Sequence, residues 1–146
     1  MSVINTQYPV AESGSELARR TAVGVLVGVV LTGIVVVVGV DVLGLEVLKR
    51  GEERAMSPFG IPAVLSAVVA GTGAAVTYAA LVRYTDRPAR NFGILSAAVF
   101  LLMLVPVFAS APGQGVSEGT GQALLVVLHA AVAVPIVAFV SGAVEM

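Results

Sequence analysis

Residues 21–40 read TAVGVLVGVVLTGIVVVVGV, twenty consecutive residues without a charged side chain. A helix of about 20 apolar residues crosses the roughly 30 Å hydrocarbon core of a bilayer. Valine favours strands in water, but inside lipid only helices and closed barrels satisfy their own backbone hydrogen bonds. A continuous apolar run also lacks the alternation that is typical of a barrel strand. The stretch therefore predicts a transmembrane helix.

A cleaved signal peptide is the alternative interpretation of this stretch. Its apolar run is longer than the apolar core of a signal peptide, which has about 7–15 residues, and a polar segment of twenty residues precedes it. We therefore expect the segment to remain in the mature protein as a membrane helix.

Three further uncharged runs follow, at residues 61–82, 92–109 and 123–143. Together the four runs predict an all-α membrane protein, a four-helix transmembrane bundle over residues 21–143 with polar tails at 1–20 and 144–146. The composition agrees, because 58% of the residues are hydrophobic and 12% are charged. A typical soluble domain has about 25% charged residues.

The basic residues of the connections predict the orientation. The N-terminal tail and the turn between the second and third helices hold five of them, and the two loops on the opposite side hold three. The positive-inside rule then places both termini on the cytoplasmic side of the cell membrane. The first external loop contains LGLEVLKRGEER at 43–54, which predicts a short interfacial element.

Basic side chains crowd the turn between the second and third helices, where Arg83, Arg87 and Arg90 follow one another closely. Arginines near a membrane surface attract anionic lipid headgroups. The alternative is that these residues only fix the topology, and the sequence does not decide between the two.

Small residues recur at helical spacing and predict close helix packing. In the second helix one row comprises Ala63, Ala67, Gly71, Ala75 and Ala79, with Ser66, Ala70 and Ala74 parallel to it; the first helix offers Gly24 and Gly28. Such faces serve either homo-dimerisation or packing within the monomer. A four-helix bundle needs them internally, so we favour packing within the monomer.

His129, Pro106 and Pro135 lie inside the third and fourth runs and form the candidate ligand-binding set. An ionisable residue at membrane depth suggests a functional site. Each proline removes a helical hydrogen bond and frees a carbonyl, that of Leu102 or Ala131. The structural alternative is a neutral imidazole hydrogen-bonded to a helix carbonyl or to a hydroxyl; the candidate hydroxyl-bearing residues are Thr72, Thr77, Tyr78 and Ser96.

Several classes of function are disfavoured by what the chain lacks. Cysteine is absent, which excludes disulfides, thiol catalysis and thiolate-bound clusters. The apolar runs contain no Asp, Glu, Lys or Arg, groups that pumps place along their paths. No catalytic or nucleotide-binding motif stands out. We therefore expect no enzymatic activity, no cofactor, no metal site and no nucleic-acid partner.

The order of the motifs resembles that of a prokaryotic family of uncharacterised four-helix membrane proteins, domain of unknown function family 6069. The resemblance covers about residues 18–143 and rests on GVDVLGLEV at 39–47, SPFGIPAVLSAVVAG at 57–71, TDRPAR at 85–90 before Phe92, LMLVPVFA at 102–109 and LLVVLHAAVAVPIV at 124–137. His129, Pro106 and Pro135 match the family's pattern. The resemblance implies the four-helix architecture and implies no activity.

The sequence thus predicts a non-enzymatic accessory or structural subunit that packs against other membrane helices, with membrane lipids and other subunits or a second copy as partners. The alternative is a small carrier or binding protein for a lipophilic ligand, a quinone or a lipid, near His129. A haem-binding redox subunit is a third interpretation, and a second histidine for the haem would have to come from another chain.

Overall fold

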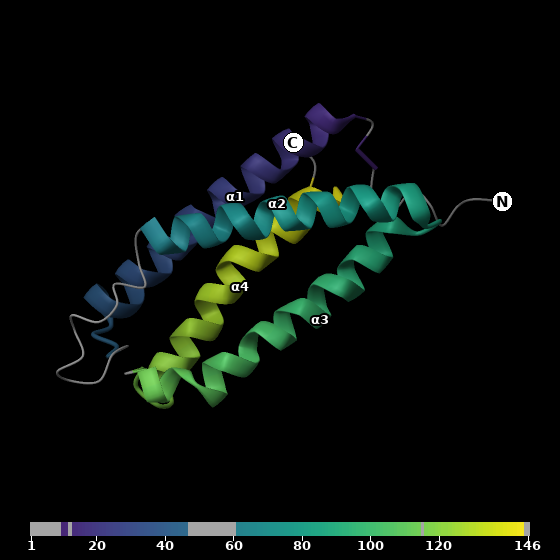
Figure 1. The fold of residues 1–146 in the computed structure, drawn as a ribbon. Helices are drawn as coiled ribbons and strands as arrows, with labels where there is room; N and C mark the ends of the chain where they lie inside the picture. The colour runs from purple at the N-terminus through teal and green to yellow at the C-terminus, as the bar shows by residue number, and fades with distance from the viewer. Residues whose placement is uncertain (1–9, 12, 47–60, 115, 145–146) are drawn as a thin grey trace.

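The computed structural model describes residues 10–11, 13–46, 61–114 and 116–144. Four α-helices run through them: α1 (Gly14–Val36), α2 (Ile61–Tyr84), α3 (Pro88–Ala109) and α4 (Thr120–Ser141). A π-helical segment, η1 (Val37–Val42), continues α1, and a 3-10 turn, η2 (Ala111–Gln114), follows α3. All four helices are long and apolar enough to cross a membrane. The predicted all-α, four-helix architecture is confirmed, and the chain is a multi-pass membrane protein (Figure 1).

The helix α1 begins at Gly14, before the apolar run that starts at Thr21. Ser13 is its N-cap, and its hydroxyl accepts a hydrogen bond from the backbone N–H of Glu16 at 3.2 Å. Glu16 also pairs with Arg20, one helical turn further on. The cap and this pair extend the helix into polar sequence, a continuation that an apolar pattern cannot reveal.

The ends of α3 and α4 also differ from the apolar runs, and local residues explain both differences. Pro88 stands in the first turn of α3, where its missing N–H costs little, so that α3 starts before Phe92. The helix α4 ends at Ser141, because Gly142 adopts a left-handed conformation with φ of 77°. The short polar segments next to the apolar runs are therefore partly helical.

The first and third loops lie at the same end of the bundle. The hydroxyl of Ser117, in the third loop, donates a hydrogen bond to the backbone carbonyl of Glu46, in the first. Residues 47–60, on which most of the predicted interfacial element falls, lie outside the described residues, as do residues 1–9 and 145–146 of the predicted tails.

The helices α1 and α4 form the closest pair, with a cluster of buried side chains near each end. One cluster comprises Tyr78, Phe92, Ile136 and Val140 and is joined by Leu17 of α1. The other comprises Leu124 and Leu128 of α4, packed against Val35, Val36 and Val40 near the end of α1. Between the clusters the backbones of α1 and α4 meet directly at glycine residues.

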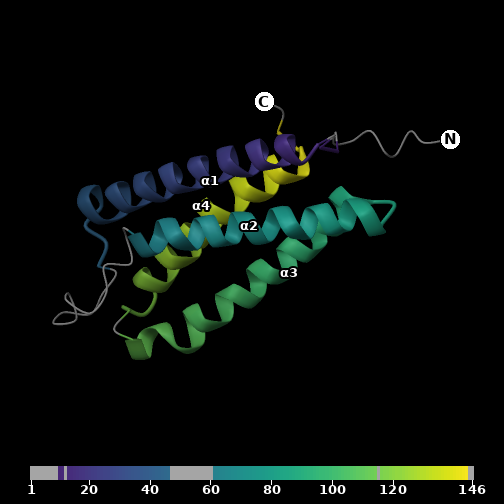
Figure 2. The ribbon, with the colours of Figure 1, turned by 45° about the horizontal axis from the view of Figure 1, so that its top comes forward.

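The helix α3 is the least packed of the four. Of its membrane span 11% is buried, against 28% for α4. Its two buried side chains, Phe92 and Val107, lie near its opposite ends. Both views place it on the far side of α2 and α4 from α1 (Figures 1 and 2). It is therefore attached to the bundle mainly at its ends.

Candidate functional site

Gly24 and Gly28 of α1 lie directly against the backbone of α4. A Cβ added to Gly24 would stand 3.1 Å from the Cα of Ile136 and 3.2 Å from the carbonyl oxygen of Pro135. A Cβ on Gly28 would stand 3.3 Å from both the Cα and the carbonyl oxygen of Val132. Within the monomer, this pair of glycines therefore serves the contact between α1 and α4.

The same contact explains how a proline is accommodated in α4. Pro135 has no N–H, so the carbonyl of Ala131 loses its helical donor. That carbonyl oxygen lies 3.5 Å from the position of a Cβ on Gly28, and Pro135 itself is buried. The glycine thus brings the α1 backbone beside the freed carbonyl and keeps it away from lipid.

The two small-residue rows of α2 face in different directions. Ala67 and Gly71 are buried, and a Cβ on Gly71 would stand 2.3 Å from the Cγ2 of Val25 in α1. Ala63 and Ala75 of the same row are half-buried, whereas Ala79, at its end, is exposed. The first row therefore packs mostly against α1.

Two members of the second row, Ser66 and Ala70, are exposed, whereas Ala74 is half-buried and packs against the cluster of Tyr78 and Phe92. Ser66 and Ala70 belong to an exposed strip of small side chains, which we call the α2 outer face. Its members are Ser66, Ala70, Gly73 and Ala80, all exposed. A Cβ on Gly73 would meet no described atom within 4 Å. Small residues on a lipid-facing helix surface allow the backbone of another helix to approach closely.

His129 is half-buried, and its Nδ1 donates a hydrogen bond of 2.7 Å to the carbonyl of Leu125, one turn earlier in α4. The partner is thus a helix carbonyl and not one of the hydroxyls considered from the sequence. Thr72 donates to the carbonyl of Val68, and Tyr78 to that of Ser141. In a neutral ring this arrangement leaves Nε2 as the acceptor.

The two intramembrane prolines do not form one site with His129. Gln122, at the start of α4, donates from Nε2 to the carbonyl of Val107 at 3.3 Å, which fixes the antiparallel register of α3 and α4. Pro106 is next to Val107, whereas Pro135 is thirteen residues beyond Gln122, or about 20 Å further along α4 at 1.5 Å per residue. Pro106 is exposed and Pro135 is buried.

A groove of about 310 Å³ opens between α1, α2 and α4. Its lining is apolar except for one hydroxyl, and comprises Val29, Thr32, Gly33, Val36, Val37, Ala63, Val64 and Val132. This volume lies at the lower end of the about 300–1,000 Å³ of small-molecule sites. Neither His129 nor the two prolines are among the lining residues, so the groove is a different site from the predicted one.

Thr32 and Gly33 give the groove its distinctive features. The Oγ1 of Thr32 is buried and has no hydrogen-bond partner in the described part of the chain. Thr21 and Thr85 instead donate to the carbonyl four residues earlier, at 2.8 and 2.7 Å. A Cβ on Gly33 would meet nothing within 4 Å. The sequence analysis missed both residues, although Thr32 is the one hydroxyl between residues 22 and 40.

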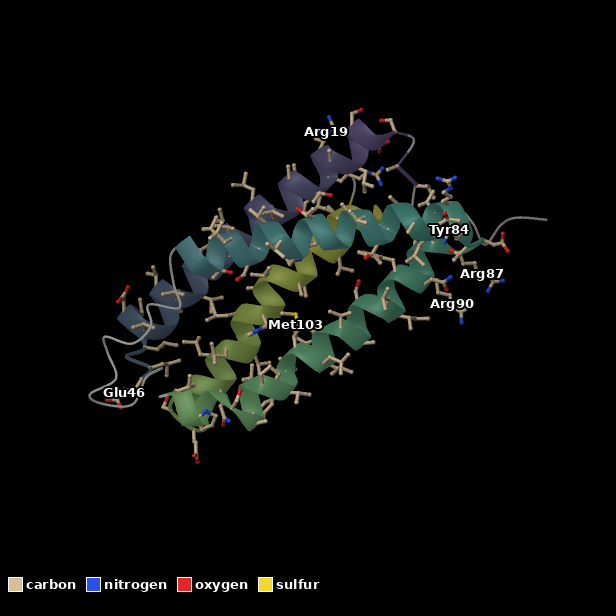
Figure 3. The ribbon with its side chains drawn as sticks, in the orientation of Figure 1. Arg19, Glu46, Tyr84, Arg87, Arg90 and Met103 are labelled. Atoms are coloured by element: carbon tan, nitrogen blue, oxygen red, sulfur yellow. The ribbon has the colours of Figure 1, made fainter. Side chains whose placement is uncertain are left out.

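Arg83, Arg87 and Arg90 are all exposed, at the end of α2 and the start of α3. The guanidinium of Arg83 lies 5.6 Å from the ring centroid of Tyr84, which is 76% exposed. Figure 3 shows Arg87, Arg90 and Tyr84 at the same end of the bundle as Arg19 of α1.

The sequence model of a family described as "Family of unknown function (DUF6069)" matches residues 12–145, almost the whole chain. No curated protein and no solved structure matches the chain.

Proposed function

We propose that this chain, which belongs to the family of unknown function DUF6069, is a non-enzymatic accessory component that binds other membrane helices through the α2 outer face. The observation that carries the proposal is the division of small residues on α2. Ala67 and Gly71 are used within the monomer, whereas Ser66, Ala70 and Gly73 are exposed.

A strip of small residues does not improve packing against flexible lipid tails, but it lets a second helix pack closely against α2. Association in a bilayer is driven by van der Waals contact and interhelical hydrogen bonds, both of which need close backbone approach. Ser66 adds a hydroxyl to the α2 outer face.

A photo-crosslinking residue placed at position 73 tests this function in native membranes. We expect an adduct with a second membrane chain or another copy, and much less adduct from position 102, where exposed Leu102 faces outward on α3. The double variant Ala70→Leu/Gly73→Leu should abolish the complex in mild detergent without loss of fold. A strictly monomeric particle with no copurifying chain would count heavily against the proposal.

A second candidate function is the binding of a lipophilic ligand, and the groove at Thr32 favours it. A buried hydroxyl without a partner costs about 1–3 kcal/mol. The lining of the groove is almost wholly apolar, so a largely apolar membrane-soluble molecule such as a quinone would fill it. This candidate moves the ligand site from His129 to the surface of α4 that carries Val132.

Gly33→Leu should place its side chain in the groove, because Gly33 lines the groove and a Cβ there meets nothing within 4 Å. We expect this variant to lose any lipophilic molecule that copurifies with the wild type, measured by mass spectrometry of the extract. Gly73→Leu is the matched control, equally open but on the α2 outer face. His129→Ala should retain the ligand. Loss of the ligand from His129→Ala but not from Gly33→Leu would show that the ligand binds near His129.

A further inference from the structure

The bundle carries unpaired positive charge at one end. Arg19, Arg83, Arg87 and Arg90 are exposed, and none of them forms an ion pair with another described residue. We call these four arginines the basic end. Arg20 differs from them, because it is 7% exposed and pairs with Glu16.

The basic end lies where the helices leave the membrane. Arg83 is in the last turn of α2, and Arg87 and Arg90 flank Pro88 at the start of α3. Exposed Tyr84 stands among them, as aromatic residues do at the level of lipid headgroups. Arg19 reaches the same end from α1, whose Leu17 packs against the cluster of Tyr78 and Phe92.

The opposite end differs in charge over the described residues. Asp41, Glu46 and Glu118 lie there, and no described residue at that end is basic. At the basic end the acidic residues that the structure describes are Glu16, which pairs with Arg20, and Asp86, which forms no described ion pair. The excess positive charge of the basic end is therefore directed outward, to whatever surrounds the helix ends.

We propose that the basic end binds the phosphate groups of anionic phospholipids. The guanidinium group donates paired hydrogen bonds to phosphate oxygens, and the position at the ends of two membrane spans places the four arginines at headgroup depth. The attraction of each basic residue to an anionic membrane surface corresponds to about a fivefold change in affinity. The site depends neither on which side faces the cytoplasm nor on the accessory function.

Native mass spectrometry of the purified protein in detergent tests the proposal, because membrane orientation plays no part there. The protein is equilibrated with equal amounts of phosphatidylglycerol and phosphatidylcholine, and the retained lipids are counted. We expect the wild type to retain phosphatidylglycerol preferentially. Arg83→Gln/Arg87→Gln/Arg90→Gln should lower this preference by about two orders of magnitude, from about fivefold for each arginine.

The control removes the same number of charges elsewhere, as Lys49→Gln/Arg50→Gln/Arg54→Gln in the loop between α1 and α2. An equal loss of preference in the control would overturn the proposal, as would an unchanged preference in the arginine variant. Displacement of the lipid by millimolar inorganic phosphate would also overturn it, since the site would then bind free phosphate. If the triple variant does not fold, Arg90→Gln and Arg90→Lys provide the test. Arg90→Gln should lower the preference about fivefold. Arg90→Lys should lower it less, because lysine keeps the charge but not the paired donors. An unchanged preference in Arg90→Gln would overturn the proposal.

Discussion

Single glycines determine how closely α1 approaches α4. Gly24 and Gly28 face backbone atoms of α4, which cannot move aside as a side chain can. Gly71 faces the Cγ2 of Val25, a branched side chain whose χ1 is restricted in a helix. A methyl group on any of the three glycines would therefore meet a close neighbour, and all three substitutions should be destabilising.

Gly24→Ala and Gly28→Ala should each destabilise the protein by about 1–3 kcal/mol, the usual cost of overpacking. Gly71→Ala should also be destabilising, because its Cβ would stand 2.3 Å from the Cγ2 of Val25, whose χ1 is restricted in a helix. Gly33→Ala and Gly73→Ala are the controls, since a Cβ at either position meets no described atom within 4 Å. Unfolding in mixed micelles under increasing SDS measures the free energy of unfolding of all five variants. Equal stability of Gly24→Ala and Gly33→Ala would contradict the close contact.

At the scale of elements, the attachment of α3 depends on two contacts. Near its start, Phe92 packs edge-on against Tyr78 of α2, with ring centroids 5.3 Å apart. At its other end, Gln122 of α4 binds the carbonyl of Val107. This carbonyl lies in the last turn of α3, where helix carbonyls lack intrahelical donors. The residues between these two ends are exposed or half-buried.

Phe92→Ala should therefore loosen α3 while α1 and α4 stay together. Phe108→Ala is the matched control, because Phe108 lies on the same helix and is 58% exposed. The chain contains no cysteine, so spin labels are readily placed at Leu101→Cys on α3 and Val127→Cys on α4. The distance distribution between the labels should broaden in Phe92→Ala only. Broadening by both substitutions would show that Phe92 is not an anchor.

The sequence predicted the four helices well and their ends less well, for physical reasons. An uncharged run marks the part of a helix that lies in hydrocarbon, which identified all four spans. It does not reveal that a cap at Ser13 and the Glu16–Arg20 pair carry α1 into polar residues. The end of α4 before Gly142 could have been predicted, since glycine is common just past a helix end.

The faces of α2 could not be assigned from its sequence alone. Both small-residue rows have the spacing of a packing face, and only the position of α1 separates buried Ala67 from exposed Ala70. The groove could not be predicted from the sequence either, because residues of three separate helices line it. His129 stood out in the sequence because it is unusual, although its Nδ1 is satisfied within its own helix.

At the scale of the whole molecule, the charges divide the bundle into a basic end and an acidic one over the described residues. Basic residues are retained on the cytoplasmic side of membranes. We therefore expect both termini in the cytoplasm, with the turn at Asp86 beside them and the third loop at Glu118 outside. Orientation and the number of spans are linked, because each crossing reverses the side.

Cysteine labelling in intact cells measures the orientation and the number of membrane crossings together. The chain has no cysteine of its own, so single cysteines are introduced as Ser15→Cys, Asp41→Cys, Asp86→Cys and Glu118→Cys. A membrane-impermeant maleimide should label positions 41 and 118 in intact cells, and positions 15 and 86 only after permeabilisation. The reverse pattern would keep four crossings and overturn the orientation. Labelling of positions 86 and 118 from the same side would contradict the four-helix membrane bundle itself.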